Sequence, residues 1–233
     1  MIKALLTIDD IASQNTKAIV DYLVEKNISA IMFAVGMNVE RYYDQAIYAV
    51  QKGMIVGNHS YSHPNFGDIS YEEGVAEIEK NEKLLDELYK TAGVERKYKP
   101  FRFPYGNKGG ENKERFQKYL RDNGFDKVDD RQVIESWWHW KGMDCDIDTF
   151  WTFDFAEYNI RKGSGFTIED VWKRMREDSE ESESILFKEG SNHILLLHAH
   201  DETEELAPEY YRKFLDYTIK KGVVFEDACF LRD

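Results

Sequence analysis

The chain has 233 residues, 42% of them hydrophobic, and it carries 31 Lys and Arg residues against 44 Asp and Glu residues, a formal net charge of −13. This length and apolar content suit one sizeable hydrophobic core, so we expect a single domain over residues 1–233. The negative charge repels phosphate backbones and anionic lipid headgroups, which argues against nucleic acid and membrane surfaces as partners.

Apolar segments alternate with amphipathic segments along the chain. Ser70, with Glu73 three residues later, has the pattern of a capping box at a helix N-terminus. Repeated strand-then-helix order predicts parallel strands with helices outside them, hence a barrel or a doubly wound sheet. In chain order, the pattern predicts a strand over 4–8, a helix over 16–26, a strand over 29–34, a helix over 39–52, a strand over 54–57, a helix over 70–89, a strand ending near 103, a helix over 111–123, a strand over 125–128, an apolar-acidic stretch over 143–150, a helix over 168–176, an acidic solvated loop over 177–183, a strand over 193–197, a helix over 208–221 and a strand over 223–225.

The start of the chain and its cysteines suggest a compartment. The first residues enter an apolar strand without the charged region, long apolar region and cleavage site of a secretory signal. No apolar stretch approaches the ~20 residues that span a bilayer. We therefore expect a cytoplasmic protein, in which Cys145 and Cys229 are buried thiols rather than a disulfide.

Polar residues gather where the predicted strands end. In a β/α barrel the carboxyl ends of the strands share one face, and active sites lie on that face. Five such groups on one face point to catalysis more strongly than any one alone. The groups are residues 9–10, 59–63, 102–106, 146–148 and 198–201.

Two of these groups suggest a metal site. His59 and His63 are four residues apart, and Pro64 predicts an irregular turn rather than a helix there. Two imidazoles and one carboxylate are the ligands of catalytic zinc. Asp9 and Asp10 project to opposite sides of an extended chain, so one can bind a metal while the other acts as a base. Capping or surface roles are the alternative for each pair.

The motifs resemble those of the polysaccharide deacetylases of carbohydrate esterase family 4, which share the NodB homology domain. The match covers nearly the whole chain, and the resemblance implies an α/β fold, a distorted (β/α)7-type barrel. The matching segments, in the order of the family motifs, are Thr7-Ile8-Asp9-Asp10, His59-Ser60-Tyr61-Ser62-His63, Arg102-Phe103-Pro104-Tyr105 and Leu196-Leu197-His198.

The resemblance implies a metal-dependent hydrolase that removes an acetyl group from an N-acetylated carbohydrate. Asp10, His59 and His63 would hold a divalent metal ion, commonly Zn²⁺. Co²⁺, Mn²⁺ and Fe²⁺ also suit imidazole and carboxylate ligands. The expected partner is a carbohydrate or another small N-acylated substrate.

The same resemblance implies four catalytic roles. Asp9 would be the general base for the attacking water, and Arg102 would hold Asp9 ionised and oriented. The backbone N–H of Tyr105 would stabilise the oxyanion, and His198 would protonate the departing amine.

The fourth family motif, Asp-x-x-Asp-Trp, is not intact. Asp148 keeps its first position and is the candidate to hydrogen-bond His198, with Asp146 and Asp154 as rivals. We interpret His200 as a polar loop residue. The alternative is that it supports the site residues. The segment Ser136-Trp137-Trp138-His139-Trp140 suits core or lid packing, or stacking on a sugar.

Three alternative functions follow from the same residues. A small cytoplasmic amide, ureide or formamide could be hydrolysed on the same scaffold. The incomplete fourth motif leaves a non-catalytic sugar-binding barrel as another hypothesis. A non-haem iron oxygenase uses the same types of metal ligand, but this hypothesis gives Asp9, Arg102 and His198 no role.

Overall fold

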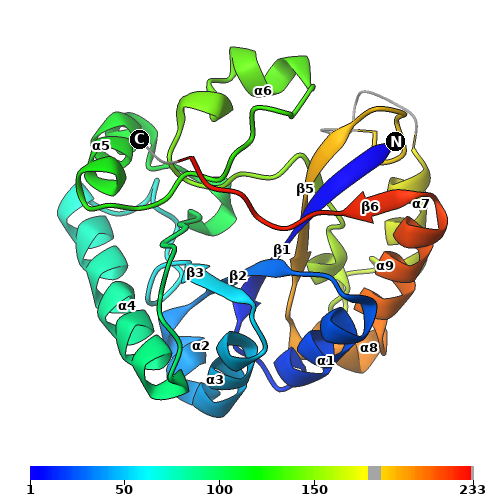
Figure 1. Ribbon diagram of the computed structural model, residues 1–233, viewed down its shortest axis with the longest axis horizontal. Coiled ribbons are helices and arrows are strands. Elements are labelled where there is room, and N and C mark those ends of the chain that lie inside the picture. The colour runs from blue at the N-terminus through cyan, green and yellow to red at the C-terminus, as the bar shows by residue number, and fades with distance from the viewer. Residues whose placement is uncertain (178–184, 232–233) are drawn as a thin grey trace.

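A parallel β-sheet forms the centre of the computed structural model, which describes residues 1–177 and 185–231 (Figure 1). Within these residues the strand order is β3-β2-β1-β5-β4, and β6 pairs with the start of β1. The parallel α/β architecture expected from the sequence is confirmed, although this sheet does not close into a complete barrel. The strands are β1 (Ile2–Ile11), β2 (Ala30–Ala34), β3 (Ile55–Asn58), β4 (Phe153–Asp154), β5 (Asn192–His198) and β6 (Val223–Phe225).

Helices lie outside the sheet, with α4 and α5 along one edge of the molecule and α7 and α9 along the other (Figure 1). The α-helices of the described ranges are α1 (Thr16–Lys26), α2 (Gly36–Arg41), α3 (Tyr43–Gln51), α4 (Tyr71–Ala92), α5 (Lys113–Asp122), α6 (Ser136–Trp140), α7 (Ile168–Arg176), α8 (Asp201–Leu206) and α9 (Tyr210–Lys220). The 3-10 helices are η1 (Pro104–Gly106), η2 (Gly110–Asn112), η3 (Met143–Cys145) and η4 (Glu157–Asn159).

β1 is the central strand of the sheet. It pairs with β5 along most of its length, and its other side pairs with β6 near the start and with β2 further along. A strand covered on both faces reads as a nearly continuous apolar run, as Ala4, Leu5 and Leu6 do here. The parallel register of β1 and β5 places Asp9 directly opposite His198 at the carboxyl ends of both strands.

Several local predictions are confirmed. The helices over 16–26 and 168–176 and the strand over 223–225 have the expected bounds. Ser70 and Glu73 form the expected capping box, in which Ser70 Oγ accepts from the Glu73 N–H and the Glu73 carboxylate accepts from the Ser70 N–H.

Other boundaries are corrected. The helix predicted over 39–52 divides into α2 and α3, because the backbone of Tyr42 leaves the helical region at φ −125° and ψ 47°. The helix predicted over 208–221 starts at Tyr210, and α8 precedes it. The strands predicted near 103 and over 125–128 are isolated bridges, Asn58 with Phe101 and Val128 with Phe230. Residues 143–150 contain η3 rather than a strand.

The expectation of buried thiols is wrong. Cys145 lies in η3 and Cys229 lies in the segment after β6, and both are free and exposed because neither occupies a core-facing position of a strand or helix. Of the acidic run over 177–183, residues 178–183 lie outside the described residues. Among the described residues no helix is long and apolar enough to cross a membrane.

Candidate active site

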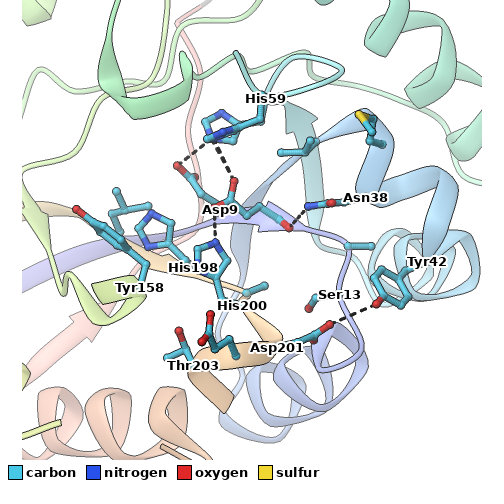
Figure 2. Close-up of a pocket in the computed structure, with 18 of the residues that line it drawn as sticks. Asp9, Ser13, Asn38, Tyr42, His59, Tyr158, His198, His200, Asp201 and Thr203 are labelled. Carbon is cyan, nitrogen blue, oxygen red and sulfur yellow. Dashed lines mark hydrogen bonds and ion pairs between the residues drawn. The ribbon is translucent and has the colours of Figure 1, made fainter. Parts of the chain in front are cut away.

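The carboxyl ends of β1 and β5 border a cavity of about 770 Å³. Asp9 and Asp10 reach it from the end of β1, and His198 and His200 reach it from the end of β5. Figure 2 shows His59, His198 and His200 directed toward the carboxylates of β1. Four of the five predicted groups, 9–10, 59–63, 102–106 and 198–201, supply described residues that line this cavity, whereas 146–148 supplies none.

Three potential ligand atoms converge on one point of this cavity. Asp10 Oδ1 lies 3.3 Å from His63 Nε2 and 3.7 Å from His59 Nε2. One donor atom from each of these three residues falls within 4.8 Å of the others. The structure thus brings together the three residues that the sequence predicts as metal ligands.

The donor set fits a divalent cation. His59 Nδ1 lies 2.8 Å from the carbonyl oxygen of Arg102, which can only accept, so in the neutral ring Nδ1 carries the proton and Nε2 keeps its lone pair. Burial, followed by the nearby His59 ring, lowers the pKa of His63 to about 4, so this imidazole is neutral at pH 7. Neutral imidazole nitrogen beside a carboxylate oxygen is the ligand chemistry of zinc.

The loop that carries the two histidines is held from outside by α4. Glu77 Oε2 accepts hydrogen bonds from the backbone N–H groups of Tyr61 and Ser62, at 3.0 Å and 2.6 Å. Ser60 and His63 have positive φ values, 62° and 60°. The turn is irregular, as Pro64 predicted, and the Glu77 contacts hold the backbone between the two histidines.

Asp9 and Arg102 form a buried ion pair beside these ligands. Arg102 Nη1 lies 2.7 Å from Asp9 Oδ1, and the other carboxylate oxygen lies 3.5 Å from His59 Nε2. Arg102 is 0% exposed, and it also donates to Thr7 Oγ1 and to the carbonyl of Thr149, both at 2.8 Å. A guanidinium satisfied in this way holds the Asp9 carboxylate in one orientation.

His198 faces two buried carboxylates. Its Nδ1 lies 3.4 Å from Glu157 Oε1, and Glu157 is 0% exposed. Burial disfavours the protonated imidazole, but Glu157, followed by Asp154 and Asp10, outweighs burial and raises the pKa of His198 to about 10. Burial also raises the pKa of Asp154 to about 6. His198 is therefore an imidazolium at neutral pH.

The expected partnership of Asp148 with His198 is corrected. Asp148 Oδ1 accepts from Gln117 Nε2 at 2.6 Å, and Asp148 Oδ2 lies 3.2 Å from Lys108 Nζ. Its rival Asp146 also pairs with Lys108, at 2.6 Å. Both carboxylates thus neutralise a buried lysine, and the sequence did not single out Glu157.

Tyr105 lies at the cavity, whereas the tryptophan segment over 136–140 lies outside it. The Tyr105 side chain is 67% exposed, lines the cavity, and has its ring centroid 4.7 Å from that of His63. Trp138 is buried against Ile194 near the start of β5, which supports core packing, whereas Trp140 is 72% exposed. No residue of 136–140 is among the described residues that line the cavity, but Trp151 is.

His200 is also in the site, against the loop interpretation of the sequence. Its Nε2 lies 2.6 Å from Asp10 Oδ2 (Figure 2). The hydrogen bond from His200, with His63 and His59 nearby, outweighs burial and holds the pKa of Asp10 well below its usual value. The available signal was the alternation of an extended chain, in which His198 and His200 share one face.

A model of the polysaccharide deacetylase family matches residues 2–128. The chain belongs to this family. The family expected from the motifs is therefore confirmed.

Curated relatives of this polysaccharide deacetylase domain are known. A peptidoglycan-N-acetylglucosamine deacetylase from Bacillus cereus is 32% identical over 149 residues, which are 62% of this chain and 48% of that protein. Chitin deacetylase 1 from Cryptococcus neoformans is 34% identical over 102 residues, 44% of this chain and 21% of that protein. The matches thus span about half or less of the length of these relatives.

A solved structure agrees with the fold. The polysaccharide deacetylase structure from Bacillus cereus superimposes with a TM-score of 0.66 at 20% identity, over 96% of this chain and 90% of that chain. This likeness confirms the deacetylase fold.

Proposed function

We propose that this chain is a single-domain, metal-dependent deacetylase that hydrolyses the acetamide group of an N-acetylated carbohydrate. The supporting observation is that one cavity is bordered by a ligand cluster, by Asp9 of the buried Asp–Arg pair and by a protonated histidine. Membership of the polysaccharide deacetylase family supports the reaction type.

Asp10, His59 and His63 would hold the metal. Zn²⁺ suits two imidazoles and one carboxylate, and Co²⁺, Mn²⁺ and Fe²⁺ are compatible with the same donors. A divalent cation in such a site acidifies water and polarises an acyl carbonyl. With three protein ligands, such a site would remain open to substrate and water.

Asp9 acts as the general base in this proposal. The carboxylate is buried, and Arg102 holds one of its oxygens at 2.7 Å while the other faces the ligand cluster. Asp9 thus accepts the proton of the attacking water as the new C–O bond forms. The backbone N–H of Tyr105 is the proposed donor to the oxyanion.

His198 acts as the general acid. Because its pKa is about 10, the ring carries a proton at neutral pH. When the amide C–N bond breaks, the nitrogen takes this proton and leaves as an amine, while the acyl group leaves as acetate. Glu157 and Asp154 keep the acid in its charged form.

The cavity walls favour a small saccharide. Tyr158 lines the cavity with its ring 4.6 Å from that of His198, and Trp151 and Tyr105 line it as well. Aromatic faces with polar edges suit sugar rings, which present C–H groups on one side and hydroxyls at the rim. We therefore propose a short N-acetylated oligosaccharide as the substrate.

Acetate release tests this function. The protein is incubated with Zn²⁺ and N-acetylglucosamine oligomers of different lengths, beside panels of formamides and ureides. We expect acetate from at least one acetylated sugar and background release from His59→Ala. If acetate release equals that of His59→Ala across the sugar panel, the proposal is contradicted. If only formamides or ureides are hydrolysed, the substrate is one of these compounds and not an acetylated sugar.

A further inference from the structure

His200 contacts one carboxylate oxygen of Asp10, and the two ligand histidines face the other. It follows β5 in extended conformation, with φ −90° and ψ 127°, immediately before α8. Its Nε2 lies 2.6 Å from Asp10 Oδ2, and its side chain is 29% exposed to the cavity (Figure 2). A carboxylate only accepts hydrogen bonds, so the ring donates through Nε2–H.

Asp10 is restrained at two further points. Its backbone has φ 64°, which a non-glycine residue adopts only when its surroundings hold it there. Asn38 Nδ2 donates to the Asp10 carbonyl oxygen at 2.9 Å. The backbone and Oδ2 are thus occupied, and Oδ1 faces the ligand nitrogens of His63 and His59, at 3.3 Å and 3.7 Å.

The two sides of the cluster are supported in the same way. The His59 ring is oriented by its hydrogen bond to the Arg102 carbonyl, and the Asp10 carboxylate is oriented by His200. Partners of this kind, bonded to the ligand rather than to the metal, typically change metal affinity by about 10- to 100-fold when they are removed.

We propose that His200 is a positioning residue that holds Asp10 as a one-oxygen metal ligand, with Oδ1 toward the metal and Oδ2 kept on His200. This inference rests on the proposed metal dependence. With one oxygen from Asp10 and one nitrogen from each of His59 and His63, the protein supplies three donor atoms, and the remaining positions stay available to substrate. Without His200, Oδ2 is released to rotate toward the metal or toward solvent.

Two substitutions of His200 separate donation from direct ligation. His200→Leu removes the donor, whereas His200→Gln presents an amide N–H at nearly the reach of Nε2. His139→Leu is the matched control, because it removes an exposed His–Asp pair, with Asp144 at 2.9 Å, from a residue outside the cavity. Circular dichroism of each metal-free variant verifies that it folds.

Zn²⁺ affinity is measured by competition with a chromogenic chelator, and Co²⁺ absorption spectra report the coordination geometry. We expect the Kd for Zn²⁺ to rise about 10- to 100-fold in His200→Leu, with an altered Co²⁺ spectrum. His200→Gln is expected to restore both to within about threefold of the wild type, and His139→Leu to change neither.

Each contrary outcome has its own meaning. An unchanged Kd in His200→Leu overturns the positioning role while leaving metal dependence intact. Equal loss in His200→Leu and His200→Gln overturns it in favour of direct ligation by His200. Wild-type protein that binds Zn²⁺ no better than Asp10→Ala contradicts both this inference and the proposed function.

Discussion

Arg102 donates through Nη1 to Asp9 Oδ1 at 2.7 Å, and the carbonyl oxygen of the same residue lies 2.8 Å from His59 Nδ1. One buried residue therefore orients both the proposed base and a proposed metal ligand. Because the two contacts use different atoms of Arg102, the base and the ligand can be tested separately by changing their own side chains.

Replacing the base should abolish turnover without releasing the metal. Asp9→Asn keeps an oxygen that accepts from Arg102, but the amide cannot take a proton from water. We expect kcat to fall by about 10²- to 10⁴-fold, while the Kd for Zn²⁺ changes only a few-fold. Steady-state kinetics and chelator competition measure the two effects.

The matched variant is Asp10→Asn, which should lose metal affinity and activity together. Asp9→Asn protein with wild-type kcat would assign proton transfer to another group. Asp9→Asn protein that no longer binds Zn²⁺ would make Asp9 a ligand.

The alkaline limb of the pH profile should depend on Glu157. His198 is active as an acid only while protonated, so activity is present below its pKa of about 10 and is lost as the pH rises through that value. Glu157→Gln removes the nearest negative charge and should move the limb down by about 1 to 3 pH units. The pH dependence of kcat/KM measures this shift.

Asp148→Asn is the control for the same limb. Its carboxylate contacts Lys108 and Gln117, so we expect no movement of the limb, although the folded state loses stability. If the alkaline limb moves in Asp148→Asn but not in Glu157→Gln, the pairing of Asp148 with His198 that the motif implied would be correct.

Acid should destabilise the fold through His193, which lies in β5. Burial lowers the pKa of His193 to about 4, and its ring nitrogens contact the hydroxyls of Thr152 and Ser191, at 3.1 Å and 2.8 Å. Since the unfolded pKa is about 6.5, the unfolded chain takes up the proton first. The stability that neutral His193 gives the folded state is therefore fully present above pH 6.5 and is lost as the pH falls toward 4.

Urea unfolding at pH 7.5 and pH 4.5 measures this contribution. The free energy of unfolding should fall by roughly 2 to 3 kcal/mol more in the wild type than in His193→Gln, which does not titrate. Equal losses in both proteins would show that His193 is not responsible for the acid sensitivity.

Removing the metal should lower the melting temperature. A ligand that binds only the folded state stabilises it by about 4 kcal/mol at a concentration 1,000 times its Kd. For a chain of this size that corresponds to roughly 8 to 16 °C. Thermal unfolding with Zn²⁺ and then with excess chelator measures the difference. His59→Ala should melt at the same temperature under both conditions, and a wild type that behaves like His59→Ala would exclude a tightly held metal.

The sequence alone determined the features that depend on nearby residues. The capping box of Ser70 and Glu73, the bounds of α1 and α7, and the spacing of His59 and His63 are local patterns, and each is present in the structure. The alternation of apolar and amphipathic segments was enough to predict parallel strands, whose carboxyl ends meet at one edge.

The tertiary structure decided which distant groups touch. His198 faces Glu157, 41 residues earlier, because η4 packs beside the end of β5, whereas Asp148 is drawn to the buried Lys108. His200 reaches Asp10 across 190 positions of sequence because β1 and β5 are paired in register. A motif specifies which residues are neighbours along the chain. Which charged group a carboxylate pairs with is decided only when the strands and loops pack together.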